Sequence, residues 1–119
     1  MNILTDITKG ASIRNALLEL GVPANIRGFM YIVYAEQLIQ QNQEYMIGIT
    51  KLLYRDIAKE FMTSPSAVER CIRTAIIDGW KVAPDEVKTK FFGNSIRQGK
   101  TVPTNGQFLV VLYHYINLH

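Results

Sequence analysis

The segment from 50 to 79 contains two helical patterns separated by a short break, and this arrangement restricts the fold more than any other feature of the chain. In the first pattern Leu53, Ile57 and Phe61 recur at every fourth position without an intervening Gly or Pro. The break, MTSP, ends in Pro65, which disfavours helical geometry at the residue before it but suits the first turn of a new helix. The segment therefore predicts two helices joined by a tight turn.

The second of these helices, over residues 64–79, is predicted to have one apolar side and one polar side. At about 100° per residue, its small and apolar residues share one side: Val68, Cys71, Ile72, Ala75, Ile76 and Gly79. The opposite side carries Ser66, Glu69, Arg70 and Arg73. We expect the apolar side to pack inward, which leaves the charged side facing solvent or a partner.

Patterns elsewhere predict four more helices, at 12–20, 29–43, 84–92 and from 104 onward. Ser12 is the expected N-cap of the first, and Thr104 with Gln107 matches a capping box at the start of the last. The last segment is rich in β-branched and aromatic residues, so a strand is the alternative there. The expected fold is all-α, with six helices in a single domain over residues 1–119.

Composition and charge narrow the class of protein. A single cysteine allows no internal disulfide, and no signal-peptide pattern is present, so a cytoplasmic location is expected. The longest apolar stretches, such as FLVVLY at 108–113, are far shorter than the ~20 residues of a membrane-spanning helix, and no membrane partner is expected. The net charge of +3 lies entirely in the second half of the chain. This asymmetry suits a nucleic-acid partner.

Two helices joined by a turn of three or four residues, the second exposing Arg near its start, are typical of a helix-turn-helix that enters the major groove of DNA. The segment at about 50–79 fits this pattern, although its turn lacks the frequent glycine. Arg70 and Arg73 have the side chain best shaped to donate two hydrogen bonds to guanine, and Glu69 can accept one from cytosine. These three side chains form a chemically suitable set for base contacts.

Other residues are candidates for contacts around this set. Ser66 and Thr74 can hydrogen-bond to phosphates or bases, and the helix N-terminus favours a phosphate. Contacts that do not depend on base sequence are expected from three cations: Lys51, Arg97 and Lys100. The site prediction therefore combines base contacts with phosphate contacts.

The same polar side also has a purely structural interpretation. A helix with Arg and Glu on one side is usually solvated, and Glu69 can pair with Arg73 at i, i+4. Ser66 with Glu69 also matches a capping box, which would give both residues a local role. The pattern by itself leaves the two interpretations open.

A longer series of motifs resembles the C-terminal DNA-binding effector domain of the sporulation master response regulator of endospore-forming Firmicutes. The motifs appear in the order ASIRNALLELGVPANIRGFMYI, GITKLLYRDIAKEF, SAVERCIRTAI and PTNGQF, and they cover about residues 11–110. The resemblance implies a six-helix fold built around a helix-turn-helix. It also implies binding to short promoter boxes as tandem head-to-tail copies, with contacts to RNA polymerase and its sigma subunit. Its recognition helix corresponds to 64–79, with Glu69, Arg70 and Arg73 facing the groove.

The chain departs from that family at positions that matter for these expectations. Ala67 stands where the family pattern has an arginine, and Thr74 stands where it has a histidine. The segment at about 80–97, which resembles the polymerase-contact region, differs most. The receiver domain that normally precedes the effector has no counterpart here. We therefore expect either a part of a longer regulator or a stand-alone protein that is not controlled by phosphorylation in cis.

Catalysis and metal binding have little support in the sequence. His114 and His119 have no accompanying Cys or acidic cluster, so no metal is expected and His114 is interpreted as a partly buried helix residue. Cys71 lies on the inner side of its helix, which favours a small core side chain over a nucleophile. Asp85 and Glu86 suit the N-terminal dipole of a helix better than paired acid–base work. No enzyme activity and no cofactor are expected.

Two functions from different classes remain. The first is a sequence-specific DNA-binding regulator that acts on promoters. The second is a stand-alone helical interaction module that acts on a full-length regulator or on RNA polymerase without binding DNA by itself. Ala67, Thr74 and the apolar Ile77 on the polar side of the helix motivate the second function.

Overall fold

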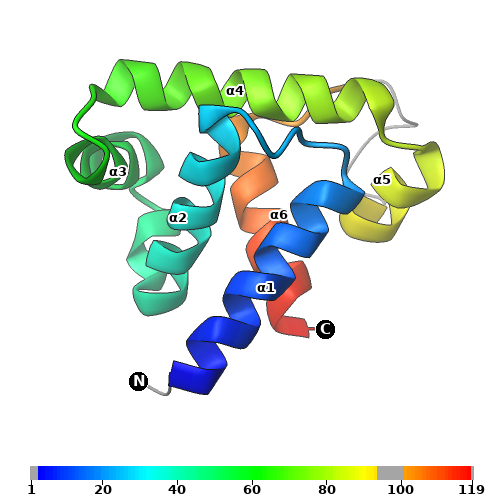
Figure 1. The fold of residues 1–119 in the computed structure, drawn as a ribbon, viewed down its shortest axis with the longest axis horizontal. Coiled ribbons are helices and arrows are strands. Elements are labelled where there is room, and N and C mark those ends of the chain that lie inside the picture. The colour runs from blue at the N-terminus through cyan, green and yellow to red at the C-terminus, as the bar shows by residue number, and fades with distance from the viewer. Residues whose placement is uncertain (1–2, 94–100, 119) are drawn as a thin grey trace.

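A computed structural model describes residues 3–93 and 101–118 of the chain (Figure 1). Its α-helices are α1 Ile3–Glu19, α2 Arg27–Gln41, α3 Tyr54–Glu60, α4 Pro65–Val82, α5 Asp85–Phe92 and α6 Asn105–Leu118. A 3₁₀-helix, η1 Gln43–Met46, and a π-helical turn, η2 Ile49–Leu53, lie between α2 and α3. The described residues form no strand, which confirms the all-α prediction and the helical interpretation of the C-terminal segment. None of these helices combines the length and hydropathy needed to cross a bilayer.

The longest helix, α4, runs along one edge of the molecule (Figure 1). α3 lies near its N-terminal end and α5 near its C-terminal end, while α1, α2 and α6 lie beneath it in this view. α2, α3 and α6 all contact α4. One side of α4 therefore packs on the rest of the protein, and the other side is left open.

The buried side of α4 is the apolar side predicted from the sequence. Val68, Ile72, Ala75 and Ile76 are buried, and Cys71 is partly buried against the same core. Across from them, a Cβ atom on Gly28 of α2 would lie 2.2 Å from the carbonyl oxygen of Cys71. Only glycine allows the backbones of α2 and α4 to approach this closely.

α3 is anchored to α2 by aromatic packing. Ile57 and Ala58 are buried, as predicted for the inner side of α3. Phe61 packs edge-on against Tyr31 and Tyr34, with ring centroids 5.0 Å and 5.6 Å apart. Because α2 also contacts α4, these rings help to hold α3 and α4 in a fixed relative position.

α1 begins at Ile3, well before the predicted start at Ser12, so the N-cap assignment of Ser12 is wrong. Lys9 Nζ donates to Asn117 Oδ1 on α6 at 2.7 Å. A Cβ on Gly10 would lie 3.6 Å from Gln37 Nε2 on α2. Lys9 and Gly10, which precede Ser12 in α1, therefore lie close to α6 and α2, and these tertiary contacts override the local capping signal.

α4 continues to Val82, past the predicted end at Gly79. A Cβ on Gly79 would lie 2.9 Å from the carbonyl oxygen of Leu20, so this glycine serves close packing inside the helix. The next residue, Trp80, is buried and packs edge-on against Phe92 with centroids 5.2 Å apart. This aromatic contact stabilises the continuation of α4 beyond Gly79.

α6 differs from prediction at one position. The buried side of α6 is formed by Phe108, Leu109, Leu112 and Ile116. His114 lies on the opposite side and is exposed, so its predicted partial burial is wrong. The helical period places it away from the apolar residues on either side of it.

Candidate nucleic-acid interface

The connection between α3 and α4 is a tight turn of residues 61–64 that uses methionine where glycine is usual. Met62 has a φ of 56°, in the left-handed region, and its side chain is 93% exposed. The N–H of Thr63 donates to the carbonyl of Ala58 at 2.9 Å, which closes the C-terminal turn of α3. The missing turn glycine is therefore replaced by a strained Met62 at a cost of roughly 1–2 kcal/mol.

Met62→Gly is expected to raise the free energy of unfolding by about 1 kcal/mol, because it removes left-handed strain from an exposed side chain. Urea denaturation of the variant against the wild type measures this change. Met62→Ala is the control, because it keeps the Cβ that causes the strain. Equal stability of the glycine and alanine variants would contradict the assignment of strain.

The N-terminus of α4 is fixed by the two residues at the end of the break. Ser64 has extended backbone angles, and its Oγ accepts a hydrogen bond from the N–H of Ala67 at 3.1 Å. Pro65 occupies the first helical position. The predicted capping box of Ser66 with Glu69 is therefore wrong, because the proline places the cap at Ser64 and Ser66 inside the first turn.

The predicted DNA-contacting residues of α4 all lie on its outer side. Ser66, Arg70, Arg73 and Thr74 are exposed, and Glu69 is half-buried. Lys51 is exposed on η2, at the start of the helix-turn-helix segment. Arg97 and Lys100 lie outside the described residues. The structure thus gathers five of the eight predicted residues on one helix surface.

A groove of about 1020 Å³ runs between α4 and the segment at 102–106. Its α4 wall contains Ser66, Glu69, Arg70 and Arg73, together with the half-buried Ile77. The neighbouring elements contribute the apolar residues Ile49, Val102 and Pro103, and also Tyr54, Thr104, Asn105 and Gly106. The charged side chains therefore stand at the edge of an apolar concavity. Thr74, on the same outer side of α4, and Lys51 do not line this groove.

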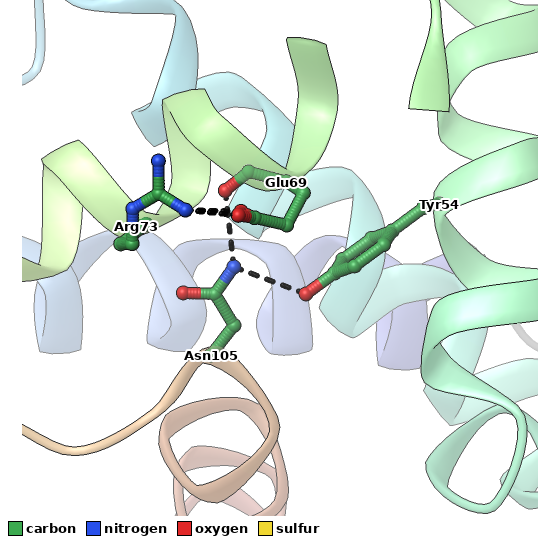
Figure 2. A network of polar contacts seen from close by, with 4 residues as sticks. All are labelled: Tyr54, Glu69, Arg73 and Asn105. Carbon is green, nitrogen blue, oxygen red and sulfur yellow. Dashed lines mark hydrogen bonds and ion pairs between the residues drawn. The ribbon is translucent and has the colours of Figure 1, made fainter. Parts of the chain in front are cut away.

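Glu69 and Arg73 form the predicted i, i+4 ion pair. Nη1 of Arg73 donates to both carboxylate oxygens of Glu69 (Figure 2). Nε and Nη2 of Arg73 keep their N–H groups for other acceptors. Among the described residues Arg70 has no ion-pair partner. The outer side of α4 therefore presents one oriented guanidinium and one unpaired guanidinium.

The structure adds Asn105 and Tyr54 to this site, and the sequence prediction missed both roles. Asn105 Nδ2 donates to Tyr54 Oη at 3.0 Å and to the backbone carbonyl of Glu69 at 3.1 Å (Figure 2). Burial raises the pKa of Tyr54 above its usual value of 10.0, so its hydroxyl stays protonated. The available sequence signal was the asparagine that follows the capping residue Thr104.

Residues 13–116 match the family model described as Sporulation initiation factor Spo0A C terminal. The chain belongs to this family. The match spans every element of the interface, from α2 to the N-terminus of α6. It therefore confirms the resemblance inferred from the sequence motifs.

Membership of the Spo0A C-terminal family indicates the general role of the chain. The family consists of DNA-binding effector domains of sporulation regulators and is not an enzyme family. DNA is therefore the partner class that the family supports for this chain. The described part of the chain also contains no group of three His, Cys, Asp or Glu side chains placed to hold a metal ion.

Proposed function

We propose that this chain is a helix-turn-helix effector domain that binds promoter boxes in a sequence-specific manner, with α4 as the recognition helix in the major groove. The observation that carries the proposal is the outer side of α4. It presents Glu69, Arg70 and Arg73 on a helix whose other side is packed against α2 and α3. A rigid helix with a free charged side is the arrangement that major-groove recognition requires.

The chemistry of these three side chains suits base edges. Arg70 is unpaired among the described residues and can donate two parallel hydrogen bonds to guanine. Arg73 is held by Glu69 through one nitrogen and can donate through the others. Glu69 has acceptor capacity left for a cytosine amino group. The pair thus offers donors and an acceptor side by side, which suits neighbouring base pairs.

The remaining predicted residues would contact the sugar–phosphate backbone. Ser66 lies in the first turn of α4, where backbone N–H groups also favour a phosphate. Thr74 is exposed further along the helix and offers a hydroxyl. The three cations Lys51, Arg97 and Lys100 would supply contacts that are independent of base sequence. Binding of copies head to tail, and contact with RNA polymerase and its sigma subunit, are further parts of this proposal.

The test is to select bound fragments from random DNA and then to titrate the selected site and a random duplex by fluorescence anisotropy. We expect the selected site to bind roughly 10³-fold or more tightly than the random duplex. The ratio should survive added salt, because salt weakens the phosphate contacts common to both duplexes. Indistinguishable isotherms would instead favour an interaction module without autonomous DNA binding.

Lys51→Ala is expected to weaken binding to all duplexes by a similar factor, because Lys51 would contact phosphate and not bases. The slope of log K against log salt concentration should fall in magnitude by about 1. Titrations at several salt concentrations measure both effects. Arg14→Ala, which removes an exposed cation from α1, is the control with the same charge change. A loss confined to the selected site would contradict a phosphate role for Lys51.

A further inference from the structure

The N-terminus of α6 meets the helix-turn-helix through one carboxamide. Thr104 and Gln107 cap this terminus reciprocally: the N–H of Thr104 donates to Gln107 Oε1 at 2.9 Å, and the N–H of Gln107 donates to Thr104 Oγ1 at 3.2 Å. Asn105 lies within this capped turn, so its backbone is held firmly. Its side chain can therefore transmit the position of α6 to the elements that it contacts.

Both hydrogens of the Asn105 amide group are used across the tertiary structure. One goes to Tyr54 at the start of α3, and the other goes to the backbone carbonyl of Glu69 in α4 (Figure 2). Tyr54 is only 6% exposed, so this contact is sheltered from water. A hydrogen bond that is partly withdrawn from solvent orients its partners more strongly than an exposed one.

The carbonyl that Asn105 contacts belongs to the same helical turn as the Glu69–Arg73 pair. In an α-helix the carbonyl of residue 69 also accepts the N–H of residue 73. Asn105 is thus bonded to the backbone that joins the two side chains proposed to face the bases. A rotation of α4 about its axis would break this bond and would move both side chains relative to α3.

We propose that Asn105 is a positioning residue for base recognition, which sets the rotation of α4 through the Glu69 carbonyl and so aims the Glu69–Arg73 pair at its base pairs. This inference rests on the proposed function of α4. It differs from a purely structural role, because it assigns to Asn105 an effect on discrimination between DNA sequences. A purely structural role would change only the fraction of folded protein.

The experiment compares Asn105→Ala with the wild type in titrations of the selected site and the random duplex. We expect the affinity ratio between the two duplexes to fall roughly fivefold to tenfold, with little change in random-duplex affinity. Asn117→Ala is the matched control. It removes another α6 carboxamide, which links α6 to Lys9 on α1. The control should keep the wild-type ratio.

A double-mutant cycle with Arg73→Ala separates positioning from general destabilisation. If Asn105 acts through the Glu69–Arg73 pair, adding Asn105→Ala to Arg73→Ala should lower the ratio little further. If the fold-losses in affinity ratio caused by the two single substitutions multiply in the double variant, the inference is overturned. A wild-type ratio in folded Asn105→Ala also overturns it.

A second substitution of Asn105 and a folding control complete the experiment. Asn105→Asp has the same shape as the wild-type side chain but cannot donate these hydrogen bonds when ionised, so it should lower the affinity ratio as Asn105→Ala does. It is used in place of Asn105→Ala if the alanine variant does not fold. Circular dichroism confirms that each titrated variant is folded. If the wild type binds the two duplexes with equal affinity, both the proposed function and this inference are contradicted. If the wild type and Arg73→Ala behave as expected but Asn105→Asp keeps the wild-type affinity ratio, only the role of Asn105 is contradicted.

Discussion

Arg73→Ala is expected to lower affinity for the selected DNA site by about 1–3 kcal/mol, which is about 5- to 150-fold, and to relax the base preference at one position. The substitution removes the donors that Glu69 holds in place on the outer side of α4. It also leaves the Glu69 carboxylate without its counter-ion near the DNA phosphates. The loss should therefore exceed that from removing a phosphate contact.

The measurement is a set of anisotropy titrations with the selected site, its single-base variants and the random duplex. For Arg73→Ala, the penalty for changing one particular base pair should shrink, while the penalties at other positions persist. Arg14→Ala on α1 is the control with the same side-chain change. Equal losses on selected and random DNA would show that Arg73 contacts phosphate and not a base.

Glu36→Met is expected to raise the free energy of unfolding at neutral pH by about 1–3 kcal/mol, because it removes a buried carboxyl group that no described residue hydrogen-bonds. Glu36 lies on the buried side of α2 with 0% exposure, and within residues 3–93 and 101–118 neither carboxyl oxygen has a hydrogen-bond partner. Burial raises the pKa of the Glu36 carboxyl well above its usual value of 4.5. Methionine has a similar length and favours a helix.

The same carboxyl group predicts how stability depends on pH. The unfolded carboxyl ionises near pH 4.5, whereas the folded one keeps its proton to higher pH. The contribution of Glu36 to stability therefore falls as pH rises from about 4.5 toward the raised folded pKa. Glu36→Met has no carboxyl group to titrate at this position, so the difference in free energy of unfolding between it and the wild type should be larger at neutral pH than near pH 4.5.

Urea denaturation of both proteins across this pH range measures the difference. Glu36→Gln should also remove the pH dependence of stability that Glu36 causes. Because it keeps a buried polar group, its free energy of unfolding at neutral pH should rise less than that of Glu36→Met. Glu44→Met, at an exposed position of η1, is the control for adding an apolar side chain. A pH-independent difference between Glu36→Met and the wild type would contradict a protonated buried Glu36.

The features predicted correctly from sequence are those that depend on neighbours a few residues away. Pro65 fixes the start of α4, since its ring and missing N–H act on adjacent residues. The two sides of α4 follow from the helical period, and so does the Glu69–Arg73 pair. The reciprocal cap of Thr104 and Gln107 was predicted for the same reason.

The failed predictions occur where a distant contact overrides a local signal. Ser12 has the chemistry of an N-cap, but α1 continues past it because Lys9 and Gly10 lie against α6 and α2. Gly79 resembles a helix end, but it is needed where α4 passes Leu20. In both cases the local preference is worth about 1 kcal/mol or less, which packing between helices readily exceeds.

The sequence by itself determined an all-α chain with a helix-turn-helix, the charged side of α4 and, through its ordered motifs, the DNA-binding family. The tertiary structure decided which groups meet that side. Tyr54 and Glu69 lie 51 and 36 residues from Asn105, so no helical or strand period connects them. The fold also placed Glu36 in the core and the segment at 102–106 beside α4. Such neighbours exist only after α2, α3, α4 and α6 have packed, because packing rather than sequence spacing brings them within contact distance.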